Sequence, residues 1–199
     1  MKSKEKGLIR SFIAIDIEGQ VREKIRGFQE ELIKKVAGMG IRVSWTKPES
    51  IHLTLKFLGD IPVSQVNPIL DSLRRAVAGV QTFTMKIEGL GAFPNFRKPR
   101  VIWVGISEGA EALRQLQPRI EQELVRLRFP KDKKKFNAHL TLGRIRSEGG
   151  TAALPDLLAS IPSPVAGLSA VRDIRLMKSD LHPSGAIYTE LGRISLVRG

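Results

Sequence analysis

Two of the three histidines in this chain occur in identical tetrapeptides. The sequence His-Leu-Thr-Leu stands at residues 52–55 and again at residues 139–142 of the 199-residue chain. The unperturbed pKa of histidine lies close to neutral pH, so two imidazoles that meet in one cleft can serve as a proton donor and a proton acceptor. The repeat therefore predicts an acid–base site that contains His52 and His139.

The first tetrapeptide stands in a run of residues typical of a β-strand. Because side chains alternate between the two faces of a strand, His52 and Thr54 are predicted to share one polar face with Lys56. The opposite face is predicted to be the core face, and its members are Ile51, Leu53, Leu55 and Phe57.

In the second run, His139 and Thr141 share a face in the same way. Strict alternation places Arg144 on the apolar side, but Gly143 can host a β-bulge that turns Arg144 toward His139. The third histidine, His182, precedes a proline and is expected in a turn. The candidate site thus contains two histidines, two threonines and one arginine.

The bulk composition sets limits on the class of protein. Hydrophobic residues make up 42% of the chain and charged residues 27%, as in an ordinary globular protein of one domain. Cysteine is absent, which excludes disulfides and thiolate metal sites. We see no apolar run of membrane-spanning length and no signal peptide in the lysine-rich start, so we expect a cytoplasmic protein without a membrane partner.

The formal net charge of +13 favours a polyanionic partner such as nucleic acid. One basic cluster, 131–135, directly precedes the second histidine motif, and another surrounds Arg97, Lys98 and Arg100 in a loop between prolines. Either cluster alone is equally well explained as a solvated, solubilising face. The position of the first cluster beside a histidine favours attraction of phosphate.

Periodicity and turn residues predict the elements that position these residues. The predicted helices cover 21–36, 66–77, 113–127 and 155–160. The predicted strands cover 11–17, 41–45, 51–58, 83–90, 101–106, 137–146, 170–177 and 186–196. We expect Pro118 to kink the third helix or to start a separate one, residues 91–100 to form a loop, and the last two strands to join through Pro183 and Gly185.

The order of strand, helix and histidine-bearing strand occurs twice, at about 11–57 and 101–146, with the histidines 139 − 52 = 87 residues apart. We therefore predict a single bilobal domain over residues 1–199. Its fold class is α+β: two pseudo-symmetric lobes of mainly antiparallel sheet, with outer helices and a central cleft.

Paired His-x-Thr-x motifs on strands of two lobes resemble the two-histidine (2H) phosphoesterase superfamily. Three further segments resemble its RNA 2′,3′-cyclic phosphodiesterase branch, historically called 2′-5′ RNA ligases, and the likeness covers essentially the whole chain. These segments are Gly-Leu-Gly-Ala-Phe-Pro at 89–94, Arg-Val-Ile-Trp-Val-Gly at 100–105 and Ser-Asp-Leu-His-Pro-Ser-Gly at 179–185.

The resemblance implies hydrolysis of a terminal ribose 2′,3′-cyclic phosphate to a 2′-phosphomonoester, without a metal or other cofactor. It also implies reversible 2′-5′ RNA ligation when an RNA 5′-hydroxyl replaces water. The expected partners are RNA ends that carry the cyclic phosphate, with tRNA fragments among the candidates, and no protein partner is indicated.

By the same analogy, His52 is the proton donor to the ribose 3′ oxygen and His139 is the proton acceptor for water. The two tetrapeptides are too alike for the sequence itself to assign these roles. On chemical grounds Thr54 and Thr141 can donate hydrogen bonds to phosphate oxygens, and Arg144 can add a cation.

The proline-bounded loop supplies two more candidates for substrate binding. Phe96 can stack on a base and Arg100 can hold a neighbouring phosphate, although an ordinary hairpin tip explains both residues equally well.

Two rival functions stay open at the level of sequence. A noncatalytic RNA-binding module explains the charge equally well. A zinc hydrolase could use all three histidines, but the chain lacks the close histidine and carboxylate spacing of such sites. The sequence leaves open the physiological RNA, the balance of hydrolysis and ligation, nucleotide effectors and the oligomeric state.

Overall fold

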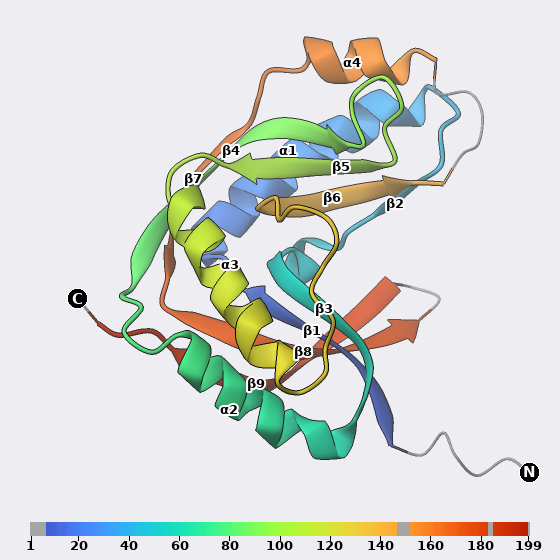
Figure 1. Ribbon diagram of the computed structural model, residues 1–199. Helices are drawn as coiled ribbons and strands as arrows, with labels where there is room; N and C mark the ends of the chain where they lie inside the picture. The colour runs from blue at the N-terminus through green and yellow to red at the C-terminus, as the bar shows by residue number, and fades with distance from the viewer. Residues whose placement is uncertain (1–6, 147–151, 183–184, 199) are drawn as a thin grey trace, which may run out of the picture.

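One antiparallel sheet runs through the molecule, as Figure 1 shows for the computed structural model. The structure describes residues 7–146, 152–182 and 185–198. The strands are β1 Leu8–Ile15, β2 Val43–Trp45, β3 Leu53–Pro62, β4 Phe83–Phe93, β5 Val101–Ile106, β6 His139–Ile145, β7 Val165–Val171, β8 Asp173–His182 and β9 Gly185–Ser195. The helices are α1 Gly19–Ala37, α2 Val66–Ala76, α3 Ala110–Val125 and α4 Leu154–Ser160, with 3₁₀ turns η1 Pro48–Ser50 and η2 Val63–Gln65.

The sheet consists of two halves that meet at the histidine strands. The strand order is β7-β4-β5-β6-β3-β1-β8-β9, and β2 pairs with β6 beside this path. The halves join where Leu53 of β3 pairs with Leu140 of β6. From this junction outward, each half begins with a histidine strand and continues with the strand that opens its predicted repeat. The predicted α+β class is confirmed, and the repeat boundaries at 11–57 and 101–146 stay a prediction.

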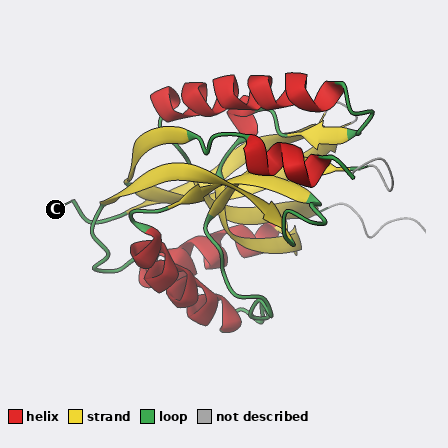
Figure 2. Ribbon diagram, turned by 90° about the horizontal axis from the view of Figure 1, so that it is seen from above, coloured by secondary structure: helices red, strands yellow, loops and turns green. Residues whose placement is uncertain are grey.

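Helices lie on both sides of the sheet, as Figure 2 shows. Helix α1 packs against β7, whereas α3 packs against β3 and α2, and α2 also contacts β9. Each half is thus covered by the helix that follows the first strand of the other half. The buried faces of these helices share one hydrophobic cluster with the strands, so the two halves fold as one core. In the described residues, no helix is long and apolar enough to cross a membrane.

Helix α3 continues through Pro118 as one helix, which corrects the expectation of a separate helix at that point. A proline removes one backbone hydrogen bond and crowds the preceding turn. Here the apolar stripe is buried on both sides of the proline, and this packing outweighs the local cost. The stripe consists of Leu113, Leu116, Ile120 and Leu124.

Two predicted elements differ from the structure. The predicted loop at 91–100 is shorter, because β4 continues to Phe93 in its pairing with β5. The predicted strand at 170–177 is two strands: β7 ends at Val171, and β8 begins at Asp173 in the other half of the sheet. Gly167 interrupts the apolar pattern of β7, which conceals that strand in the sequence. Pro183 and Ser184, expected in the last turn, lie outside the described residues.

Candidate active site

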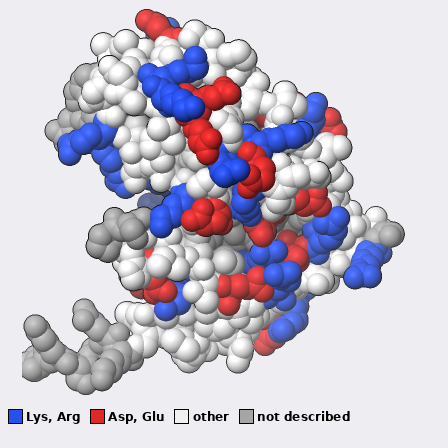
Figure 3. Space-filling model, turned by 180° about the vertical axis from the view of Figure 1, so that it is seen from behind, with Lys and Arg blue, Asp and Glu red and all other residues white. Residues whose placement is uncertain are grey.

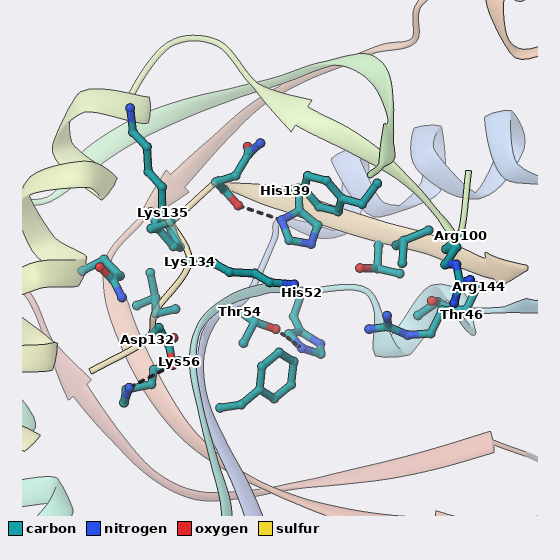
Figure 4. A pocket seen from close by; sticks show the side chains of 18 of the residues that line it. Thr46, His52, Thr54, Lys56, Arg100, Asp132, Lys134, Lys135, His139 and Arg144 are labelled. Atoms are coloured by element: carbon teal, nitrogen blue, oxygen red, sulfur yellow. Dashed lines mark hydrogen bonds and ion pairs between the residues drawn. The ribbon is translucent and has the colours of Figure 1, made fainter. Parts of the chain in front are cut away.

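A cavity of about 1140 Å³ lies where β3 and β6 meet. Both tetrapeptides contribute to it, since its lining includes His52, Thr54, His139 and Thr141. Figure 4 shows the two imidazoles inside this one cavity, His139 from β6 and His52 from the residue that precedes β3. The structure therefore brings the two motifs into one cavity, whereas the chemical roles of their residues stay a prediction.

The ring of His52 is held by its own backbone and by two aromatic rings. Its Nδ1 lies 2.8 Å from the carbonyl oxygen of Ser50, and its Nε2 lies 3.0 Å from Oγ1 of Thr54. Because a carbonyl only accepts, Nδ1 carries the proton and Nε2 is left for chemistry. Phe12 stacks on the imidazole at 4.7 Å between centroids, and Tyr188 packs edge-to-face with it at 5.1 Å.

The ring of His139 is held in the same way, by a backbone carbonyl and aromatic neighbours. Its Nδ1 donates to the carbonyl oxygen of Asn137 at 2.7 Å, two residues upstream, as His52 donates to Ser50. Phe93 meets the ring edge-to-face at 4.8 Å, and Trp103 lies at 6.0 Å between centroids. Within the described residues, Nε2 of His139 has no hydrogen-bond partner, whereas Nε2 of His52 has Thr54. The two histidines therefore share a tautomer but differ at the reactive nitrogen.

Arg22 of α1 fixes the segment that holds His52. Its Nη1 donates to the carbonyl oxygens of Pro48 at 2.9 Å and of Ile51 at 2.8 Å. These carbonyls flank Ser50, whose own carbonyl accepts from the imidazole. Arg22 is held in turn by an ion pair with Asp16. The guanidinium thus sets the position of the turn η1 and, through it, the orientation of the ring.

Burial lowers the pKa of both histidines below the ordinary value, because the charged imidazolium loses its hydration. Hydrogen bonds to Ser50 and Asn137 oppose this effect. The positive charge of Arg144 further lowers the pKa of His139. Burial raises the pKa of the Tyr188 phenol, which therefore stays protonated at neutral pH. At neutral pH the lowered pKa favours the neutral form of both imidazoles.

The predicted bulge in β6 is present. The β5–β6 register passes from Trp103 opposite Thr141 to Ile102 opposite Gly143, so Leu142 is the extra residue. Arg144 consequently lines the cavity with the histidines. A glycine is needed at 143, since a Cβ there would lie 2.8 Å from the ring of Trp45.

Lys56 and Phe57 do not follow the predicted alternation. Lys56 is buried and forms an ion pair with Glu121, whereas Phe57 is 64% exposed instead of lying in the core. An irregularity in the β1–β3 register causes this change, because it inserts one extra residue, Leu55, into β3 between Thr54 and Lys56. Lys56 still lines the cavity, but its ammonium group is engaged by carboxylates.

The loop after β4 brings one of its two candidates to the site. Arg100 lines the cavity and lies near Arg144 in Figure 4. Phe96 packs against the hydrophobic core and is not a lining residue, so the structure does not bring it to the histidines. The aromatic residue of this segment that does line the cavity is Phe93.

The lysines of the basic cluster at 131–135 that line the cavity are Lys133, Lys134 and Lys135. Other lining residues were not singled out from the sequence, among them Thr46, Phe93 and Tyr188. Tyr188 is the only tyrosine in the chain and stands on β9, far in sequence from both motifs. Its place depends on the pairing of β9 with β8 and of β8 with β1. The only sequence signal for Tyr188 is the alternation of polar and apolar residues in the last predicted strand, and this pattern does not reveal with which strand β9 pairs.

The Gly-Leu-Gly-Ala-Phe-Pro segment has a steric explanation. The indole of Trp103 lies over Gly91 on the paired strand, where a Cβ would come within 2.2 Å of the ring. Gly105 admits the other edge of the same ring, with a Cβ at 3.2 Å. The glycines therefore make room for Trp103, which with Phe93 forms the aromatic wall beside His139.

No group of three or more His, Cys, Asp or Glu side chains is placed to hold a metal ion in the described part of the chain. His182, the third histidine of the zinc alternative, is exposed at the end of β8 and does not line the cavity.

Comparison with known proteins identifies the family of this chain and supports the fold. The family described as LigT like Phosphoesterase matches this chain twice in succession, at residues 15–103 and 104–188, with one histidine motif in each match. This protein belongs to the LigT-like phosphoesterase family. The predicted membership of the two-histidine phosphoesterases is therefore confirmed.

Relatives in the LigT-like family cover nearly the whole chain. An RNA 2′,3′-cyclic phosphodiesterase of Archaeoglobus fulgidus is 36% identical over 92% of this chain and 98% of its own length. An RNA 2′,3′-cyclic phosphodiesterase of Aquifex aeolicus is 33% identical over 92% of this chain and 94% of its own length. The crystal structure of E. coli LigT in apo form superimposes with a TM-score of 0.74 at 25% identity, covering 96% of this chain and 99% of the other.

Proposed function

We propose that this LigT-like phosphoesterase hydrolyses RNA 2′,3′-cyclic phosphodiester ends to 2′-phosphomonoesters without a metal ion. The observation that carries the proposal is the matched pair of imidazoles, each with Nδ1 tied to a backbone carbonyl and Nε2 directed into one cavity. Relatives of 31–36% identity that bear the name RNA 2′,3′-cyclic phosphodiesterase support the choice of substrate.

The reaction needs one proton removed and one supplied. His139 accepts a proton from water on Nε2 as the water oxygen attacks phosphorus. His52 donates a proton from Nε2 to the ribose 3′ oxygen as the bond between that oxygen and phosphorus breaks. Each such step is typically worth about 10² to 10⁴ in rate. The free Nε2 of His139 suits the acceptor role, since nothing in the described chain competes for its lone pair.

The contact between His52 and Thr54 suits the donor role. Neutral His52 accepts a hydrogen bond from the Thr54 hydroxyl on Nε2. When Nε2 is protonated, it no longer accepts, and the hydroxyl is released to donate to a nonbridging phosphate oxygen. Thr141 donates to the same group from β6, and Arg144 and Arg100 add positive charge from the other side of the histidines. The same steps with an RNA 5′-hydroxyl in place of water produce a 2′-5′ linkage.

The test is product analysis with metal removed. The protein is incubated with a short RNA that ends in a 2′,3′-cyclic phosphate, in excess chelator, and the position of the product phosphate is determined by phosphorus NMR. We expect complete conversion to the 2′-phosphomonoester. A 3′-phosphate product, no consumption of the cyclic end, or loss of turnover on chelation would each contradict the proposal.

A further inference from the structure

A basic loop beside the histidines is held in place by a buried ion pair. We call residues 130–136 the lysine loop; its lysines are Lys131, Lys133, Lys134 and Lys135. It connects the end of helix α3 to strand β6, and its residues 132–136 line the same cavity as His52 and His139. Figure 4 shows Lys134 and Lys135 extending from the side of the cavity opposite Arg100 and Arg144.

The ion pair anchors the start of the loop to the first histidine strand. Nζ of Lys56 lies 2.6 Å from Oε1 of Glu121, and the two side chains are only 2% and 7% exposed. The ammonium group also donates to the carbonyl oxygen of Pro130 at 2.9 Å and to Oδ1 of Asp132 at 3.3 Å. The second oxygen of Glu121 accepts from the backbone N–H of Asp132 at 3.1 Å.

Such burial of two charges costs free energy that only well-made contacts offset. Gln117 of α3 donates to Oε1 of Glu121 at 3.2 Å, and the other contacts that compensate the charges are made to the loop itself, at Pro130 and Asp132. A solubilising surface loop has no need of this arrangement. The buried pair therefore indicates a loop whose position matters.

The far end of the loop leads directly to His139. Phe136 packs against the hydrophobic core, and the next residue, Asn137, provides the carbonyl that orients the imidazole. The lysine loop is thus fixed to the strand of His52 at one end and to the support of His139 at the other.

The side of the cavity formed by the lysine loop carries an excess of positive charge. Among the cavity-lining residues that the structure describes, Asp132 is the one carboxylate, and it already faces Lys56. Lys133, Lys134 and Lys135 form no ion pair with any described residue. By contrast, Figure 3 shows Lys and Arg interspersed with Asp and Glu across the face opposite that of Figure 1. The cavity volume of about 1140 Å³ also exceeds the ~300–1,000 Å³ typical of small-molecule sites.

We propose that the lysine loop binds the phosphodiester backbone of the RNA strand on the 5′ side of its cyclic end, so that the protein prefers RNA chains to cyclic mononucleotides. The inference rests on the proposed function and specifies its substrate class. Unpaired ammonium groups are suited to this task, because they attract successive phosphates without reading the bases. The Lys56–Glu121 pair is a positioning device that keeps these groups beside the histidines.

The experiment compares two substrates and two charge variants. The substrates are adenosine 2′,3′-cyclic phosphate and an oligoribonucleotide that ends in the same nucleotide. The test variant is K133Q/K134Q/K135Q. The matched control is K24Q/K34Q/K35Q, which removes the same charge from exposed positions of α1 that do not line the cavity.

For the test variant we expect kcat/KM on the oligonucleotide to fall about 10-fold to 100-fold, while the mononucleotide loses no more than about threefold. The slope of log KM against log salt should become shallower by about 0.7 for each phosphate that the variant no longer neutralises. The control should match the unmodified protein on both substrates. An equal decrease on the two substrates, or no decrease on either, would overturn the inference.

Binding separates this inference from the proposed function. Fluorescence anisotropy of a labelled oligoribonucleotide should give the same 10-fold to 100-fold weakening for K133Q/K134Q/K135Q. If the protein bound RNA through the lysine loop but hydrolysed neither substrate, the proposed function would fail and the loop assignment would stand. If the protein hydrolysed the mononucleotide but bound RNA independently of the lysine loop, the loop assignment would fail and the proposed function would stand.

A second variant tests the anchor without leaving a buried charge unpaired. K56M/E121L replaces both partners with apolar residues, a change that buried ion pairs often tolerate. We expect a folded protein that keeps all four lysines of the lysine loop. It should bind the oligonucleotide at least about fivefold more weakly, with a shallower dependence of affinity on salt. Unchanged affinity and slope would show that the anchor does not position the loop.

Discussion

Leu53 and Leu140 lie directly opposite each other where the two halves of the sheet join, and each follows a histidine of the cavity. Both side chains are fully buried. Because side chains alternate along a strand, burial of both leucines directs their neighbours, the two histidines and two threonines, to the opposite face. One pair of core residues thus brings two tetrapeptides 87 residues apart in sequence into one acid–base site.

The lowered pKa values of the two histidines predict an acidic optimum. His139 must be neutral to accept a proton, so activity rises as pH increases through its pKa. His52 must be protonated to donate, so activity falls as pH increases through its own pKa. Burial places both below the ordinary value of 6.5. We therefore expect kcat/KM for the cyclic phosphate to follow a bell-shaped curve with its maximum below pH 6.5. A kcat/KM maximum at pH 8, or a flat profile, is incompatible with the assigned roles of His52 and His139.

The same shifts affect stability. Between the lowered pKa values and 6.5, the unfolded chain binds more protons than the folded one. The free energy of unfolding should therefore rise with pH through that window. Urea titrations at several pH values measure this change.

Removal of one threonine hydroxyl should slow the chemical step. Thr141→Val keeps the shape of the side chain and removes the donor to the phosphate oxygens. We expect kcat to fall about 10²-fold, as for the loss of one oxyanion-hole donor, with little change in KM. Thr141→Ser restores the hydroxyl and serves as the control, with most of the activity retained. A larger change in KM than in kcat would assign Thr141 to substrate binding alone.

Arg22 should act on the reaction through His52. Arg22→Lys keeps the positive charge but removes the fork that holds Pro48 and Ile51. We expect kcat to fall about tenfold, because small displacements of a catalytic group reduce rate strongly. KM should stay within about twofold, since Arg22 does not line the cavity of about 1140 Å³. Arg26→Lys, on the exposed face of α1, is the matched control. An effect on the melting temperature without an effect on kcat would reduce Arg22 to a structural role.

The place of Trp103 over Gly91 predicts a steric coupling. In Gly91→Ala the new methyl group overlaps the six-membered ring of the indole. We expect a decrease of about 1–3 kcal/mol in the free energy of unfolding. Trp103→Phe in the Gly91→Ala background should recover part of this decrease, because the smaller ring leaves room. Gly27→Ala in α1 meets no atom within 4 Å and should be neutral or stabilising. Equal destabilisation at both glycines would contradict the coupling.

The sequence predicted the parts of the site that follow from local pattern. The alternation in each tetrapeptide placed His52, Thr54, His139 and Thr141 on polar faces, and Gly143 predicted the bulge that turns Arg144 inward. These features depend on residues within a few positions of one another, which is the range that periodicity describes.

Features set by distant strands were not predictable in this way. Lys56 departs from its expected face because Leu55 is an extra residue in β3 relative to β1, and no local pattern marks such an insertion. Tyr188 and Phe12 meet His52 only through the pairing of β9, β8 and β1. Phe96 was expected at the cavity because an aromatic residue in a basic loop resembles a stacking platform, yet it packs against the core.

The most direct measurement compares single and double histidine variants on an RNA that ends in a 2′,3′-cyclic phosphate. His52→Ala and His139→Ala should each lower kcat by about 10² to 10⁴, and the double variant should lose much less than the product of the two effects, because the residues act as a unit. His182→Ala, which changes the exposed third histidine, should keep full activity. Circular dichroism confirms that each variant is folded. A double variant that still consumes the cyclic end at the unmodified rate would contradict the assignment of His52 and His139 as the acid and base.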